Sequence, residues 1–199
     1  MTDTLITVGL DSPEAASLLA ALDHEYSERY KGYTGFGEDT EATDDLEIFP
    51  PVLFEEPLGT LLLLQRNGET IAAGGFIYLD EETAEVKRVW TSPEHRRQGL
   101  SRRIMEALEE AAAARGYRKI YLTTGPRQPE AVRLYTSLGY TAHFDTEADP
   151  EDIVHLAFEK RISDAPYLAI PAELEGKAAQ QREVVEETYQ RRSRPETRL

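Results

Sequence analysis

A chain of 199 residues, 40% of them hydrophobic and 30% charged, is long enough to enclose the core of one folded domain and has the balance of a globular protein. It contains no cysteine, which excludes disulfides, thiolate metal sites and a cysteine-bound acyl intermediate. A net charge of -15 argues against general binding to nucleic acid, because a phosphate backbone would be repelled. No secretion signal or membrane-spanning run is visible, so we expect a cytoplasmic protein that contacts no membrane.

The first predicted elements are a short strand and a helix. Residues 5–10 favour a strand, and Ser12 followed by Pro13 is typical of a helix start. Apolar residues then recur at helical spacing as far as Tyr30. Residues 31–57 are rich in Gly, Pro, Asp and Glu, which predicts a long loop with at most one short helix. A loop of that length tends to carry function.

A hairpin and a third strand are expected next. Two apolar runs, 60–66 and 69–79, are joined by Asn67-Gly68, a pair that tolerates the positive φ angles of a tight turn. After a second turn, residues 83–91 alternate as a strand does.

The second half of the chain alternates helices and strands. A helix is predicted from about Gly99 to Arg115, and a shorter one follows Pro129 and ends at Gly139. Strands are expected at 118–124, 140–145 and 152–160. The order β-α-β-β-β-α-β-α-β-β predicts an α/β domain around a mixed sheet.

The C-terminal segment differs in composition. We expect one domain over residues 1–160 and a polar helical extension over 161–199, with its helix at about 172–192. Such a helix either docks on a partner subunit or forms a mobile tail.

The segment that carries chemistry joins strand 83–91 to the helix at Gly99. A strand that runs into a Gly-containing turn and then a helix presents free backbone N–H groups at the positive end of a helix dipole, which suits a diphosphate. Gly99 allows close approach of the backbone, and Arg96, Arg97 and Arg102 add charged donors. The alternative is an ordinary turn with solvated arginines.

Charge is unevenly distributed along the chain. Residues 1–60 carry 14 acids and two bases, whereas residues 88–133 carry ten bases and five acids. One interpretation is a solvated acidic surface that maintains solubility. The other is a cationic patch for a phosphorylated ligand beside an acidic wall for a cationic one. Composition does not choose between them.

Two motifs in this order resemble the GNAT superfamily of N-acetyltransferases. Arg96-x-x-Gly99-x-Ser101 is similar to the family signature R/Q-x-x-G-x-G/A, which binds the pyrophosphate of acetyl-CoA. The segment from Gln128 through Tyr135 to Gly139-Tyr140 resembles the family's N-x-x-A-x-x-L-Y-x-x-x-G-F/Y. Ser101 stands where Gly or Ala is usual, and Gln128 where Asn is commoner. The similarity spans roughly residues 5–160.

The resemblance implies a fold, a co-substrate and a binding site. The fold is a mixed, mostly antiparallel sheet of about six to seven strands flanked by helices, with the strand at 83–91 splaying from the strand at 118–124. Acetyl-CoA is the implied co-substrate, and no metal is expected. The implied coenzyme-binding residues are Val89, Trp90, Thr91, Arg96, Arg97, Gln98, Gly99, Leu100, Ser101, Arg102 and Gln128.

Tyr135 and Glu85 are the candidate catalytic residues. Tyr135 matches the family's general acid, which protonates the departing thiolate, although it also lies on an apolar helix face. Glu85 stands eleven residues before Arg96, as does the strand glutamate that is the general base in the histone-acetylating branch. It is equally well one polar residue of an alternating strand.

The sequence therefore predicts direct transfer of an acetyl group from acetyl-CoA to a primary amine of a small molecule or peptide. The resemblance implies an acceptor wall at the end of the first helix and in the loop after it, and the alternative is an ordinary solvated loop. The candidates are the aromatic residues and acids in this part of the chain: Tyr26, Tyr30, Tyr33, Phe36, Glu38, Asp39, Glu41, Asp44 and Asp45. The alternatives are a non-catalytic acyl-CoA-binding or regulatory module and a longer acyl donor. A homodimer is possible.

Overall fold

The computed structural model describes residues 2–35, 48–165 and 169–193. Within these residues seven strands form one mixed sheet in the order β1-β2-β3-β4-β5-β7-β6, in which only the β4–β5 pair is parallel. This confirms the predicted fold class. The strands are β1 (Asp3–Thr7), β2 (Thr60–Arg66), β3 (Glu69–Tyr78), β4 (Thr83–Thr91), β5 (Lys119–Thr124), β6 (Thr141–Ala142) and β7 (Leu156–Arg161).

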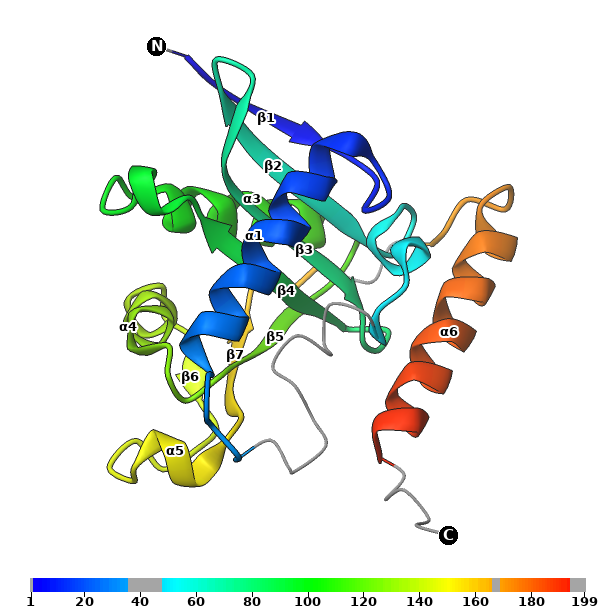
Figure 1. Cartoon of the computed structure of the whole chain (residues 1–199). Helices are drawn as coiled ribbons and strands as arrows, with labels where there is room; N and C mark the ends of the chain where they lie inside the picture. The colour runs from blue at the N-terminus through cyan, green and yellow to red at the C-terminus, as the bar shows by residue number, and fades with distance from the viewer. Residues whose placement is uncertain (1, 36–47, 166–168, 194–199) are drawn as a thin grey trace, which may run out of the picture.

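Helices cover both faces of the sheet. They are α1 (Pro13–Arg29), α3 (Leu100–Ala114), α4 (Pro129–Ser137), α5 (Pro150–Ile153) and α6 (Glu175–Ser193), with 3-10 turns η1 (Pro51–Phe54) and η2 (Pro93–His95). Figure 1 shows α1 in front of the sheet and α3 behind it. One core lies under α1, η1 and α6, and the other under α3 and α4.

Strand β2 contributes side chains to both hydrophobic cores. Its four consecutive leucines, Leu61 to Leu64, are all buried. Leu61 and Leu63 belong to the core under α1, whereas Leu62 and Leu64 belong to the core under α3. A strand covered on both faces requires an unbroken apolar run, because successive side chains point to opposite sides.

The hairpin between β2 and β3 forms as predicted, and β3 brings α3 close to the sheet. Asn67 and Gly68 take φ angles of 52° and 83° at the turn. Farther along β3, a Cβ added at Gly74 would lie 2.7 Å from Ile104 Cγ2 and 2.9 Å from Leu108 Cδ1. The missing side chain at Gly74 thus lets α3 pack directly on the sheet.

Strands β4 and β5 separate toward their C-terminal ends. Their parallel pairing runs from Thr83–Lys119 to Val86–Leu122, and the structure shows no further pairs between these two fully described strands. Residues 87–91 of β4 are therefore not paired with β5. This separation opens the sheet at the point where α3 and α4 begin.

A bulge in β4 lies at the same place. Ala73 pairs with Trp90 and Gly75 with Lys87, so two residues of β4 stand opposite one residue of β3. One of the two, Arg88, has a φ of 60°. A bulge of this kind re-aims the side chains that follow it.

Two predicted strands are shorter than expected. The run 140–145 forms only β6, two residues long. The run 152–160 is strand only from Leu156, because residues 150–153 form α5. The cause is local: the Asp149 side chain accepts a hydrogen bond from the Glu151 N–H, and Pro150 fits the first helical position.

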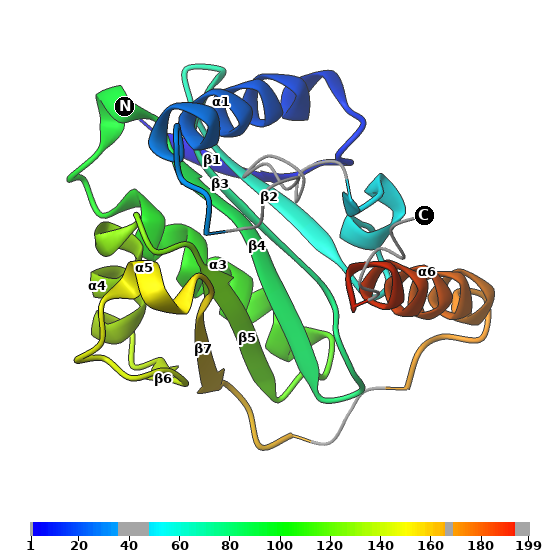
Figure 2. The same ribbon diagram turned by 60° about the horizontal axis from the view of Figure 1, so that its bottom comes forward.

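The C-terminal helix α6 packs on its own chain. Figure 2 shows it beside η1. The Gln181 side chain is fully buried and makes three hydrogen bonds to the backbone around η1: it donates to the carbonyls of Val52 and Glu55, each at 2.7 Å, and accepts from the Leu58 N–H at 3.3 Å. Val185 joins the core under α1. A few buried side chains in an otherwise polar sequence therefore attach α6 to the rest of the domain.

Candidate active site

A cavity of about 450 Å³ opens where β4 and β5 separate. Its walls come from α1, the second half of β4, the turn into α3, the end of β5 and the start of α4. Eleven of the 13 predicted site residues line it: Val89, Trp90, Thr91, Arg96, Arg97, Gly99, Leu100, Ser101, Arg102, Gln128 and Tyr135. The structure thus gathers two distant motifs around one space.

The two predicted residues that do not line the cavity are Gln98 and Glu85. The Gln98 carboxamide oxygen accepts a hydrogen bond from Arg66 at 3.0 Å, on the outer side of the turn. Glu85 is buried and directly precedes Val86, the first residue of β4 that lines the cavity.

The turn into α3 has the geometry of an anion site. Gly99 begins the helix with a φ of 75°, and Arg97 has a φ of 64°. No side chain of the described residues caps this helix end, and its first residues, Gly99, Leu100 and Ser101, line the cavity. A Cβ at Gly99 would meet no protein atom within 4 Å. The backbone here is accessible to a ligand, and the residues present fit a diphosphate.

Two hydroxyl groups brace this turn. Thr91 Oγ1 and Ser101 Oγ lie 2.8 Å apart and join the end of β4 to the first turn of α3. The Arg102 guanidinium donates a hydrogen bond to the Ser137 hydroxyl on α4 at 3.0 Å. Ser101, the departure from the family signature, therefore has a structural partner.

Tyr135 lies deep in the cavity wall. Only 6% of it is exposed, and its ring packs on Tyr140 and Phe158 at centroid distances of 5.8 and 5.5 Å. Burial raises the pKa of the Tyr135 phenol, and Tyr26 on α1 adds to the rise. The phenol is therefore held in its neutral, proton-donating form.

Glu85 forms a buried ion pair. Its carboxylate lies 3.0 Å from the Lys87 ammonium, and the side chains are only 4% and 8% exposed. The same ammonium sits 4.0 Å from the centre of the Phe49 ring. Lys87 lines the cavity whereas Glu85 does not, so Lys87 stands on the cavity side of the pair.

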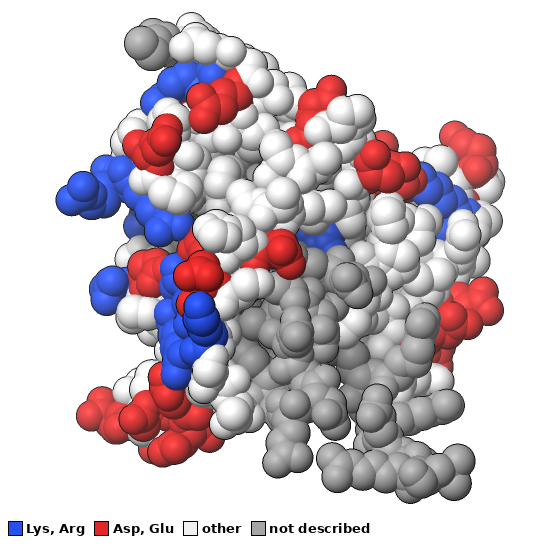
Figure 3. Space-filling view, viewed as in Figure 1, with Lys and Arg blue, Asp and Glu red and all other residues white. Residues whose placement is uncertain are grey.

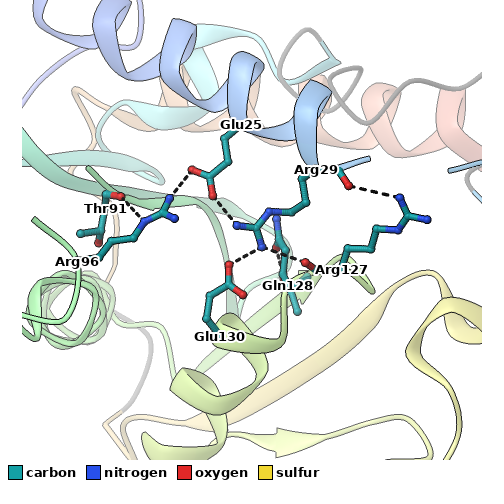
Figure 4. A network of polar contacts seen from close by, with 8 residues as sticks. Glu25, Arg29, Thr91, Arg96, Arg127, Gln128 and Glu130 are labelled. Carbon is teal, nitrogen blue, oxygen red and sulfur yellow. Dashed lines mark hydrogen bonds and ion pairs between the residues drawn. The ribbon is translucent and has the colours of Figure 1, made fainter. Parts of the chain in front are cut away.

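A chain of ionic contacts links residues of the cavity lining (Figure 4). Glu25 on α1 contacts Arg29 at 2.7 Å and Arg96 at 2.9 Å, and Arg29 also pairs with Glu130 at the start of α4. Burial lowers the pKa of Arg29, but the two carboxylates outweigh this and raise it. Sequence reasoning missed Glu25 and Arg29 as cavity residues. Only their i,i+4 spacing was visible, and it points to an ordinary surface pair.

The predicted acceptor wall is only partly described. Tyr26 lines the cavity. Tyr33 lies away from it, with its hydroxyl donating to the Glu151 carbonyl at 3.2 Å, and Tyr30 packs against Gly125. The other candidates lie outside the described residues: Phe36, Glu38, Asp39, Glu41, Asp44 and Asp45.

The charge pattern of the surface is mixed. Figure 3 shows Lys and Arg gathered along the edge that holds the turn into α3 and the start of α4, with acidic side chains among them. No group of His, Asp and Glu with metal-site geometry occurs among residues 2–35, 48–165 and 169–193. None of the helices described is long and apolar enough to span a membrane.

Comparison with known proteins assigns the family. A model of the Acetyltransferase (GNAT) family matches residues 19–140, and the chain belongs to this family. Among curated relatives, an uncharacterised N-acetyltransferase of Escherichia coli, YjgM, is 26% identical over 149 residues, which are 69% of this chain and 86% of that protein. An IAA acetyltransferase of Azospirillum brasilense is 28% identical over 137 residues, 68% and 84% of the two chains.

Solved structures share the fold. A Klebsiella pneumoniae protein, described as a candidate acyl-CoA N-acyltransferase, superposes with a TM-score of 0.61 at 27% identity and covers 81% of this chain and 99% of its own. A phosphinothricin acetyltransferase of Sinorhizobium meliloti in complex with AcCoA gives 0.56 at 15% identity, covering 87% and 95%. At that identity the likeness concerns the fold alone.

Proposed function

We propose that this protein transfers an acetyl group from acetyl-CoA to a primary amine by direct attack in a ternary complex. The observation that carries the proposal is the single cavity that joins the Gly99 turn to the Tyr135 phenol. With no cysteine in the chain, a thioester enzyme intermediate has no residue to form on. The acetyltransferase family to which the chain belongs supports the reaction class.

In this proposal the turn into α3 holds the coenzyme's diphosphate. The N–H groups of the first helical turn and the guanidinium of Arg96 supply donors, and Gly99 keeps the approach free of a side chain. The stretch of β4 that does not pair with β5, residues 89–91, offers its backbone to the pantetheine arm on that side. Backbone N–H groups there polarise the thioester carbonyl.

Tyr135 is the proposed general acid. A phenol whose pKa is raised by burial remains protonated throughout the neutral range, and the same rise makes its proton transfer to the thiolate more uphill, so its position at the reacting atoms has to provide the advantage. The buried ring is also held in place by aromatic neighbours. Tyr135 thus has the fixed position that proton transfer requires.

Glu85 is the proposed base. An ammonium near pKa 10.4 must lose a proton, which costs about 4–5 kcal/mol at pH 7. Glu85 is paired with the Lys87 ammonium and does not itself line the cavity, so in this proposal the proton reaches Glu85 through water. For Glu85→Gln the pH–rate profile should lose its acid limb, and an unshifted profile would assign the base role elsewhere.

The proposed function is tested by incubating the protein with acetyl-CoA and a panel of amines and measuring release of the coenzyme thiol. Because the chain has no cysteine, a thiol reagent detects only the product thiol. We expect release with at least one amine class. Binding of CoA without release across small amines, amino acids and peptides would favour the alternative, a non-catalytic acyl-CoA-binding module. The panel also covers acyl chain length if longer acyl donors are included.

A further inference from the structure

Glu25 is the one carboxylate of the cavity lining that contacts the Arg96 guanidinium in the described structure. Its Oε2 accepts from Arg96 at 2.9 Å, and its Oε1 accepts from Arg29 at 2.7 Å. The contact joins α1 to the turn before α3, 71 residues away. Glu25 and Arg96 both line the cavity, and their side chains are 23% and 43% exposed.

Arg96 is fixed from two sides. Its Nε donates to the Thr91 carbonyl at 3.3 Å while its NH2 donates to Glu25. Thr91 ends β4 and belongs to the backbone stretch proposed for the pantetheine arm. The guanidinium therefore links α1 to the end of β4 within the cavity lining.

Glu25 is itself anchored and cannot swing freely away. Arg29 holds its other oxygen, and Arg29 is bound in turn to Glu130 and to the Arg127 carbonyl, the latter at 3.0 Å. These partners belong to the turn after β5 and to the first turn of α4, which is another wall of the cavity. A diphosphate at the Gly99 turn would meet Arg96 with this carboxylate already in contact.

We propose that Glu25 is a positioning residue of the coenzyme site: it directs the Arg96 guanidinium toward α1 and competes with the coenzyme's diphosphate for it. This inference rests on the proposed function, because it assumes that the diphosphate binds at the Gly99 turn. Two anions that share one guanidinium repel each other, and at a partly buried site this repulsion is only weakly screened. Removing the charge of Glu25 should therefore tighten coenzyme binding about threefold or more, which is the effect of a unit charge about 6 Å away even at the dielectric constant of water.

Calorimetric titration of the full chain with CoA at about 0.15 M salt tests the inference, because surface charges farther away are screened at that ionic strength. Glu25→Gln removes the charge and keeps the hydrogen-bonding shape. Glu28→Gln, an exposed position on the same helix outside the cavity lining, is the matched control for net charge. Arg96→Gln and the double variant Glu25→Gln with Arg96→Gln complete a thermodynamic cycle.

The expected result is tighter binding for Glu25→Gln, no change for Glu28→Gln, and no gain from Glu25→Gln when Arg96 is already replaced. A merely structural role of Glu25 would weaken binding. Equal or weaker affinity of Glu25→Gln overturns the inference, and so does a gain that persists without Arg96 or that Glu28→Gln shares. If the wild-type chain binds no CoA, the proposed function fails as well, so the two failures are distinguishable.

Discussion

Replacing Gly99 by alanine separates the stability of the turn from its capacity to bind coenzyme. Gly99 has a φ of 75°, in the left-handed region, and a Cβ there would touch no protein atom within 4 Å. The folded state should therefore lose only the backbone strain, about 1–2 kcal/mol, or roughly 2–6 °C in Tm for a chain of this size. Coenzyme binding should fall at least about tenfold, or 1.4 kcal/mol, because the new methyl group projects where the diphosphate must approach the backbone.

The chain offers a matched control for this substitution. Gly139, which follows α4, has a φ of 83° and equally open space around its Cβ, but it lies outside the cavity lining. Gly139→Ala should lower Tm by a similar amount and leave the Kd for CoA unchanged. Thermal unfolding and calorimetric titration of both variants measure the two quantities. Equal CoA affinity of the two variants would refute the diphosphate site at Gly99.

Three further predictions concern catalysis, the C-terminal helix and pH. Tyr135→Phe should lower kcat about 100-fold or more while the Kd for CoA stays within about twofold. An unchanged kcat would exclude the acid role. Because burial raises the pKa of Tyr135, the wild-type rate should show no alkaline decline from this phenol below about pH 10. Gln181→Leu leaves the buried Leu58 N–H without its side-chain acceptor and removes one of two donors from each of the Val52 and Glu55 carbonyls, so it should cost about 2–3 kcal/mol in urea unfolding, against a negligible change if α6 is not docked. Hydrogen bonding to Arg66 lowers the pKa of Asp3 from 3.8 to about 2, so the stability that Asp3 provides is present above pH 4 and lost as the pH falls toward 2. The stability difference between wild type and Asp3→Asn in urea unfolding should follow that course, and a difference that persists at pH 2 would contradict it.

The sequence predicted well those elements whose signals are local. The Asn67-Gly68 turn, strand β4 and the two motif helices follow from residues within a few positions of each other. The proposed diphosphate site rests on the same kind of local signal, because the turn at Gly99 consists of a strand, a glycine and a helix in direct succession.

What the sequence did not predict depends on contacts between distant segments. The bulge at Arg88 arises from pairing with β3 and has no local signature. The contact of Glu25 with Arg96 requires α1 to lie over the separated strands, and the docking of α6 depends on one buried glutamine. Residues 150–153 did carry a local signal in Asp149-Pro150, which a strand assignment overlooked.

The most direct test of the account is a crystal structure of the chain with CoA. The account predicts the diphosphate on the N–H groups that follow Gly99, the pantetheine arm between the separated ends of β4 and β5, and the sulfur within hydrogen-bonding reach of the Tyr135 hydroxyl. A coenzyme bound elsewhere, or a sulfur far from that hydroxyl, would contradict it.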